Sequence, residues 1–202
     1  MIAIVDYGMG NLRSVEKALE RVGFEARITS DPTEIAAAGH VVLPGVGAFG
    51  DGMAGLRSRG LVGAVGEAAL SGRPFLGVCL GMQLLFDSSE ESPGVSGLGV
   101  ARGTVKRLRV KLKVPHMGWN NLAMRKESRL LAGLPAGSYV YFVHSYIVCP
   151  ADEGLIAAEA DYGGPFAAAI ERANLFATQF HPEKSQEVGL AILRNFGGMK
   201  AA

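Results

Sequence analysis

One segment of the sequence places a potential nucleophile on a sharp turn: Cys79 lies between Gly77 and Gly81 in the run Gly-Val-Cys-Leu-Gly. An apolar stretch that favours a strand, residues 75–78, precedes it, and a stretch that favours a helix, residues 81–86, follows it. In a strand-to-helix elbow the nucleophile has a strained backbone, and larger side chains two residues away would collide with the adjoining elements. A helix N-terminus also stabilises a thiolate. The pattern predicts that Cys79 is reactive.

The alternative for Cys79 is a small buried apolar residue, which is what most free cysteines are. The second cysteine, Cys149, has no comparable setting, so we expect it to be structural. Both glycines and both flanking elements favour the catalytic interpretation for Cys79.

A thiolate needs a partner that accepts its proton and later protonates the leaving group, and histidine has a suitable pKa. His181 follows the apolar strand 175–180 directly, at the strand end where α/β proteins build active sites. Glu183, two residues later, could fix the imidazole tautomer through a carboxylate hydrogen bond. Without Cys79, His-Pro-Glu would more simply be a turn before a capped helix.

These residues fall within an alternating pattern of strands and helices, which predicts an α/β fold with an open, mostly parallel sheet and helices on both faces. The early strands are expected at residues 2–5, 26–29, 40–44 and 74–78, with helices at 11–22, from 31 and over 51–70. After residue 95 we expect an antiparallel β extension, with strands within 99–114, 138–148, 155–161, 166–171 and 175–180, and a last helix over 183–196. All 202 residues are expected to form one domain.

The composition excludes several classes of function. A net charge of +1 gives no electrostatic reason to expect nucleic acid or an anionic membrane as partner. No apolar run approaches the roughly 18 residues that span a bilayer. The first residues lack the features of a signal peptide, and two cysteines make a disulfide framework improbable, so we expect a cytoplasmic protein. No metal and no cofactor is predicted.

The Gly-x-Cys-x-Gly elbow together with the later His-Pro-Glu resembles the class I (triad) glutamine amidotransferases. Within them, the resemblance is strongest to the family of glutaminase subunits that serve imidazole glycerol phosphate synthases in histidine biosynthesis. Five segments carry it, in the same order: residues 6–11, 44–50, 77–86, 115–120 and 144–146. The resemblance implies a cysteine thioester mechanism that releases ammonia from L-glutamine, with Cys79 as nucleophile, His181 as proton carrier and Glu183 orienting His181.

The resemblance also implies the remaining site residues. Backbone N–H groups of Leu80 and of the loop Gly45-Val46-Gly47 would hold the oxyanion. Glutamine would contact Gly47, Gln83, Glu91, Ser145 and Tyr146, although the adjacent Glu90 leaves the choice of Glu91 open.

The implied partner is a cyclase/synthase subunit, a (β/α)8 barrel, bound as a heterodimer and contacted by Lys184 and Trp119. The alternatives are an ordinary solvated lysine and a core indole. The basic alternating run 105–114 we interpret as a solvated strand face without a site.

Three rival functions remain at this stage. Another glutaminase of the superfamily, such as the vitamin B6 synthase type, would share the chemistry but differ in its partner. A non-catalytic assembly subunit is disfavoured by the intact Cys79, His181 and Glu183. A peptidase or hydrolase unrelated to glutamine is disfavoured by the second matching loop at residues 44–50.

Overall fold

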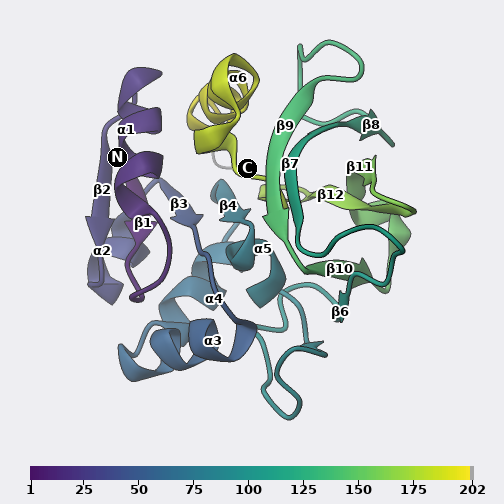
Figure 1. Cartoon of the computed structure of the whole chain (residues 1–202). Coiled ribbons are helices and arrows are strands. Elements are labelled where there is room, and N and C mark those ends of the chain that lie inside the picture. Colours follow the sequence, from purple (N-terminus) through teal and green to yellow (C-terminus); the bar gives the residue numbers. More distant parts are fainter. Residues whose placement is uncertain (201–202) are drawn as a thin grey trace.

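A twisted eight-stranded sheet forms the centre of the molecule, in the order β2-β1-β3-β4-β13-β12-β11-β8 (Figure 1). The computed structural model describes residues 1–200. The sheet strands are β1 (Ile2–Val5), β2 (Ala26–Thr29), β3 (His40–Leu43), β4 (Phe75–Val78), β8 (Ala123–Met124), β11 (Ile156–Asp161), β12 (Pro165–Arg172) and β13 (Leu175–Thr178). Strands β2, β1, β3, β4 and β13 pair in parallel, and β12, β11 and β8 continue the sheet antiparallel. The predicted fold class is confirmed.

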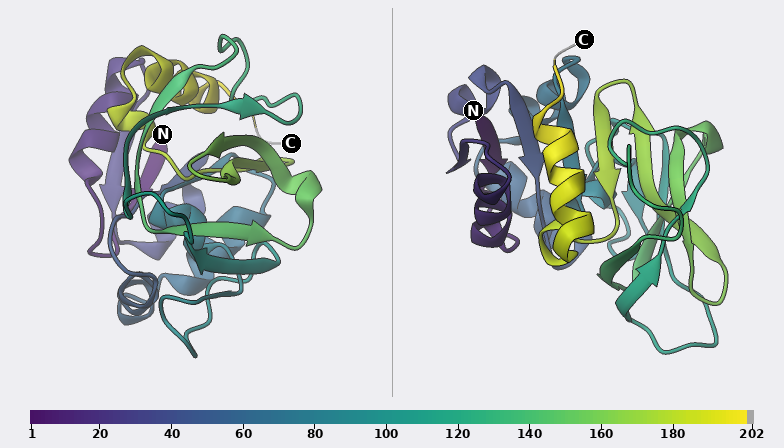
Figure 2. Two further views of the ribbon diagram at one scale, coloured as in Figure 1. Left: turned by 45° about the vertical axis from the view of Figure 1, so that its right-hand side comes forward. Right: turned by 90° about the horizontal axis from the view of Figure 1, so that it is seen from above.

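Helices cover both faces of the parallel half. They are α1 (Leu12–Arg21), α2 (Pro32–Ala37), α3 (Phe49–Ser58), α4 (Val62–Leu70), α5 (Leu80–Leu84) and α6 (Gln186–Gly197). Helices α1 and α6 pack together on one face, and α2 packs with α4 on the other (Figure 2). Side chains of β1 alternate accordingly: Ile2 and Ile4 join the core under α1 and α6, and Ala3 and Val5 join the core under α2 to α4. Strands β1, β4 and β13 are therefore buried on both sides, as their apolar sequences predict, whereas the edge strand β2 is partly exposed.

Local signals set the helix boundaries. The Asp31 side chain accepts a hydrogen bond of 2.8 Å from the Thr33 N–H and caps α2, as the sequence predicts. The helical region expected over 51–70 is present as two helices, α3 and α4, separated at Gly60, whose φ of +66° ends the first. The helix expected over 183–196 begins only at Gln186, after a 3₁₀ turn, η2 (Pro182–Lys184).

The antiparallel extension adds two small sheets, β10-β6-β5 and β7-β9. Their strands are β5 (Ser88–Ser89), β6 (Gly103–Arg107), β7 (His116–Asn121), β9 (Tyr139–His144) and β10 (Tyr146–Pro150), and a second 3₁₀ turn, η1 (Glu153–Leu155), leads into β11. The segment 138–148, expected as one strand, is divided at Ser145 between two sheets.

The basic run 105–114 is not a strand over its whole length, and that prediction is wrong. Strand β6 ends at Arg107, opposite Tyr146, the first residue of its partner β10. One further backbone hydrogen bond follows, from the Leu108 N–H to the Ser145 carbonyl at 2.8 Å. Beyond Leu108 the backbone has no strand to pair with, so alternation of side chains alone does not make a strand there.

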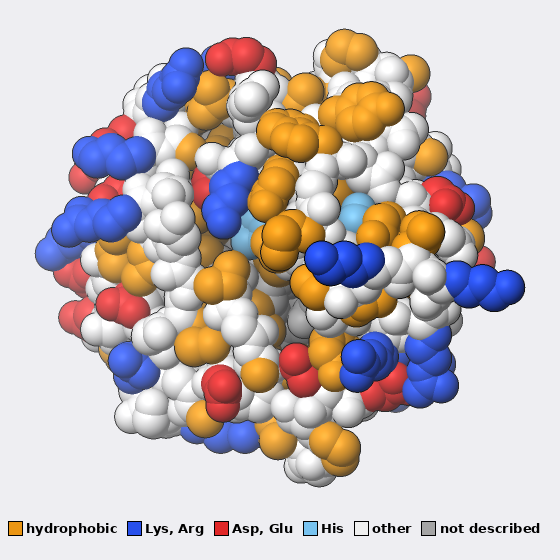
Figure 3. Space-filling view, viewed as in Figure 1, with side chains coloured by type: hydrophobic (Ala, Val, Ile, Leu, Met, Phe, Trp, Pro, Cys, Tyr) orange, Lys and Arg blue, Asp and Glu red, His pale blue; other side chains and the backbone are white. Residues whose placement is uncertain are grey.

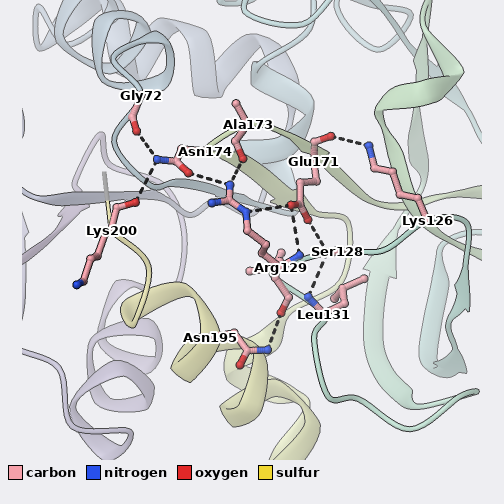
Figure 4. A network of polar contacts seen from close by, with 11 residues as sticks. Gly72, Lys126, Ser128, Arg129, Leu131, Glu171, Ala173, Asn174, Asn195 and Lys200 are labelled. Carbon is pink, nitrogen blue, oxygen red and sulfur yellow. Dashed lines mark hydrogen bonds and ion pairs between the residues drawn. The ribbon is translucent and has the colours of Figure 1, made fainter. Parts of the chain in front are cut away.

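A network around Arg129 anchors the segment between β8 and β9 to the edge of the sheet (Figure 4). The Arg129 guanidinium lies 3.5 Å from a Glu171 carboxylate oxygen and also donates to the Ala173 carbonyl and the Asn174 side chain. Glu171 accepts a further hydrogen bond of 2.5 Å from the Ser128 hydroxyl. A cavity of about 820 Å³ adjoins this network, and the pairing of Arg129, Ser128 and Glu171 with one another gives them a structural role.

Candidate active site

Cys79 occupies a strained turn between β4 and α5. Its φ of 53° and ψ of −105° are unfavourable for any residue with a side chain. A Cβ on Gly81 would lie 1.8 Å from the Leu43 carbonyl oxygen, and one on Gly77 would lie 2.9 Å from the Gly81 carbonyl oxygen. The glycines on either side are therefore required by the close approach of β3, β4 and α5, and the predicted elbow is present.

His181 reaches the same edge of the sheet because β13 pairs in parallel with β4, with Thr178 opposite Val78. The Cys79 N–H donates to the Thr178 carbonyl at 2.7 Å, which continues the pairing into the elbow. His181 Nδ1 lies 2.8 Å from Glu183 Oε1, and the two side chains are only 2% and 4% exposed. His181 Nε2 is buried and has no hydrogen-bond partner among residues 1–200, so this nitrogen is free for a reacting group.

The protonation state of His181 suits a thiolate partner. Burial disfavours the imidazolium, but contact with Cys79 and Glu183 and the negative charges of both outweigh burial and raise the pKa of His181 to about 10. At neutral pH the ring is therefore an imidazolium beside the Glu183 side chain. An imidazolium at this position can protonate a leaving nitrogen.

A cavity of about 410 Å³ opens beside Cys79. Its lining includes Val46, Gly47, Cys79, Leu80, Gln83, Glu91, Ser145, Tyr146 and Lys184, together with Pro115, Val143 and His144. Every glutamine-binding position expected from the sequence thus lies on its wall. Of the two neighbouring acids, Glu91 lines the cavity and accepts a 2.8 Å hydrogen bond from the Phe49 N–H. Glu90 lies outside the cavity, where it accepts from the Arg107 backbone N–H and pairs with the Arg109 guanidinium.

The loop Gly45-Val46-Gly47, which we call the oxyanion loop, does not leave the Leu80 N–H free as the sequence predicts. The Gly45 carbonyl accepts a hydrogen bond of 3.3 Å from the Leu80 N–H, the same group that was expected to hold the oxyanion. Gly45 itself does not line the cavity and packs against the Tyr7 hydroxyl, where a Cβ would lie 2.1 Å from the oxygen. In this structure Leu80 is therefore not available to a substrate oxygen.

Sequence reasoning missed Gln179, which is fully buried beside the nucleophile. Its Nε2 donates to Cys79 Sγ at 3.7 Å, and its Oε1 accepts from Gln83 Nε2 at 3.2 Å. The available signal was its place two residues before His181 on the same strand end.

Trp119 lies outside the cavity on β7, 46% exposed and edge-on to Tyr141. Hydrophobic side chains gather over β7 and β9 on this face of the molecule, next to a hollow (Figure 3). The exposed ones among them include Met117 and Tyr139. Among residues 1–200, no cluster of three or more His, Cys, Asp or Glu side chains could hold a metal, and no helix has the length and apolar character to cross a bilayer.

Comparison with known proteins gives the family. The model of the glutamine amidotransferase class-I family matches residues 3–198. The chain belongs to this family. Among curated members, it is 54% identical to the imidazole glycerol phosphate synthase subunit HisH of Moorella thermoacetica, over 97% of this chain and 93% of that one. It is 52% identical to the HisH subunit of Aquifex aeolicus, over 96% and 94% of the two chains.

Solved structures share the fold of this amidotransferase at lower identity. A crystal structure described as a glutamine amidotransferase superimposes with a TM-score of 0.77 at 21% identity, covering 98% of this chain and all of the other. A putative GMP synthase subunit from Thermoplasma acidophilum gives a TM-score of 0.71 at 23% identity, covering 98% and 92%. At these identities the likeness concerns the fold.

The elbow geometry predicts that Gly81→Ala destabilises the amidotransferase strongly, by several kcal/mol, because the new Cβ would overlap the Leu43 carbonyl. Gly66→Ala in the interior of α4 is the matched control: a Cβ there meets nothing within 4 Å, so it should stabilise by about 0.5–1 kcal/mol. Urea denaturation of the two variants measures both effects. Equal stability of the two variants would contradict this account of the elbow.

Proposed function

We propose that the chain is the glutaminase subunit of an imidazole glycerol phosphate synthase, hydrolysing L-glutamine and passing ammonia to a cyclase/synthase subunit in histidine biosynthesis. The observation that supports this most is the cavity beside Cys79, whose wall carries every expected glutamine contact, with the His181–Glu183 pair just beyond the end of the neighbouring strand β13. The HisH relatives match over more than nine tenths of their own lengths, which supports the specific synthase over other glutaminases.

The reaction uses Cys79 as a thiolate and His181 as an imidazolium. The Cys79 thiolate attacks the carboxamide carbon of glutamine, and the oxygen becomes an oxyanion. The imidazolium of His181 gives its Nε2 proton to the nitrogen as the C–N bond breaks, so ammonia leaves and a γ-glutamyl thioester remains on Cys79. Neutral His181 then takes a proton from water, which attacks the thioester. Glutamate departs, and the thiolate and imidazolium are restored.

Glu91 and the neutral polar groups on the cavity wall bind glutamine. The Glu91 carboxylate is suited to the α-ammonium of glutamine. Gln83, Ser145 and Tyr146 supply further polar contacts. A substrate that carries an ammonium fits this wall better than an uncharged amide does.

The oxyanion loop regulates the rate of glutamine hydrolysis. Because the Leu80 N–H is bonded to the Gly45 carbonyl, the loop has to move before Leu80 can hold an oxyanion. Val46 is β-branched and resists positive φ, which opposes a peptide flip at this point. Binding of the synthase with its own substrate would shift the loop toward the active arrangement, and glutamine would not be lost in its absence.

The synthase partner is a (β/α)8 barrel that forms a heterodimer with this chain in the cytoplasm. The exposed Met117, Trp119 and Tyr139 supply an apolar contact surface, and Lys184 supplies a charged contact beside the cavity. Residues 1–202 act as one domain in this assembly.

Single substitutions of Cys79, His181 and Glu183 test the role proposed for each residue. Cys79→Ser should abolish glutamine hydrolysis, and His181→Ala should lower kcat by about 10²–10⁴-fold, with Glu183→Gln less severe because an orienting group contributes less than the proton carrier. Ammonia supplied directly should restore synthesis in all three complexes. The rates of glutamine hydrolysis and of ammonia-dependent synthesis are measured in the complex with the synthase. A Cys79→Ser complex that cannot use ammonia either would contradict the scheme.

Val46→Gly tests the loop. A bias of about 3 kcal/mol would hold idle hydrolysis down by roughly a hundredfold, so the variant should raise the rate of the chain alone and reduce its stimulation by the synthase. Val110→Gly, in the loop after β6, is the matched control and should change neither rate. If the wild-type chain hydrolyses glutamine as fast alone as in the complex, the loop does not restrain hydrolysis and this proposal is wrong.

Lys184→Glu should weaken binding of the synthase by about two- to fivefold and reduce stimulation, since an exposed charged contact contributes up to about 1 kcal/mol. Arg27→Glu, on the edge strand β2, is the charge-matched control. Calorimetric titration and coupled turnover provide the two measurements. Unchanged values for Lys184→Glu would make Lys184 an ordinary solvated lysine.

A further inference from the structure

Two histidines outside the triad form a buried pair. His116 on β7 and His144 on β9 are directly opposite each other in the antiparallel register, and they are 2% and 6% exposed. His116 Nδ1 lies 3.0 Å from His144 Nε2. His144 also lines the glutamine cavity, so the pair joins the cavity wall to strand β7.

The partners of each nitrogen fix both tautomers. His144 Nδ1 lies 3.1 Å from the Tyr146 carbonyl oxygen, which can only accept, so Nδ1 carries the proton. Burial, then the nearby His116, lower the pKa of His144 to about 3, so the ring is neutral and its Nε2 accepts. His116 must therefore donate from Nδ1, and its own Nε2 is left as the acceptor facing the Asn120 amide at 3.5 Å.

Neighbouring aromatic rings hold His116 in this orientation. It is stacked on Tyr162 with ring centroids 4.0 Å apart and on Phe142 at 4.9 Å, both with an interplanar angle of 23°. A ring confined in this way on two stacking partners has little freedom to rotate. The direction of the hydrogen bond to His144 is therefore set by packing.

The pair acts on the segment that lines the glutamine cavity. The Tyr146 carbonyl accepts from His144 Nδ1 and, at 3.1 Å, from Gln83 Nε2. Gln83 Nε2 also bonds to Gln179 Oε1 at 3.2 Å, and Gln179 Nε2 reaches Cys79 Sγ. A continuous chain of hydrogen bonds thus runs from β7 through Tyr146 to Cys79.

We propose that His116 and His144 are positioning residues for glutamine: their directional hydrogen bonds fix the Tyr146 carbonyl, and thereby the Ser145-Tyr146 wall and the Gln83 amide that glutamine contacts. This inference rests on the proposed glutaminase function. Neither ring exchanges a proton with the substrate, because both are neutral donors and acceptors whose nitrogens are already used. Their loss should therefore affect the KM for glutamine more than kcat.

His116→Phe and His116→Asn separate positioning from packing. Phenylalanine keeps the stacking but offers no donor to His144, whereas the asparagine amide can replace the Nδ1 donor but fills less of the space. We expect His116→Phe to raise the KM for glutamine by about tenfold, with kcat changed less than about threefold. The KM of His116→Asn should stay closer to that of the wild type, although this variant unfolds more easily. A purely structural role predicts the opposite order, with activity following stability.

His144→Asn provides a second variant, because its amide can still donate to the Tyr146 carbonyl; it should bind glutamine better than His144→Phe does. The control is His40→Phe. The His40 imidazole lies on β3 and is hydrogen-bonded to the Met199 carbonyl, so its loss should leave the KM for glutamine unchanged. All variants are assayed in the complex with the synthase subunit. ¹⁵N NMR of the wild-type imidazoles at pH 7 should show a protonated Nδ1 on both His116 and His144.

The outcomes are distinct. If wild type does not hydrolyse glutamine in the complex, the proposed function fails, whatever the NMR result. If wild type is active but His116→Phe has an unchanged KM, or activity follows stability across the variants, the positioning role is overturned. A protonated Nε2 on either ring would overturn it as well.

Discussion

The parallel pairing of β4 with β13 is the constraint on which the rest of the site depends. The two strands are distant in sequence, yet their register places Val78 beside Thr178, so the elbow and His181 emerge at one edge of the sheet. The bond from the Cys79 N–H to the Thr178 carbonyl, 2.7 Å long, extends this pairing into the strained turn itself. A shift of that register by one residue would point the strand side chains to the opposite faces and separate Cys79 from His181.

Features encoded by neighbouring residues could be predicted from the sequence, and features that depend on distant partners could not. The elbow at Cys79 and the cap at Asp31 are local, and both are present as expected. The basic run after Arg107 alternates like a strand, but a strand also needs a partner, and β10 supplies none beyond Tyr146. Gln179 was missed for a related reason: a buried amide is recognisable only once the groups that it bonds are known.

Polar groups around Cys79 fall into two sets with different tasks. His181 and Glu183 form a charged pair, which is costly to bury and is retained where the charge performs chemistry. Gln83 and Gln179 are neutral and can satisfy each other without a large desolvation cost.

Two backbone carbonyls near the cavity, those of Tyr146 and Gly45, differ in how firmly they are held. The Tyr146 carbonyl accepts two side-chain hydrogen bonds and is fixed, whereas the Gly45 carbonyl accepts one long bond of 3.3 Å from the Leu80 N–H. A single long hydrogen bond contributes little and can be exchanged for one to an oxyanion, whereas two shorter bonds to one carbonyl resist exchange. The weaker contact is therefore at the loop that has to move in the proposed mechanism, and the stronger contacts hold the segment that follows β9.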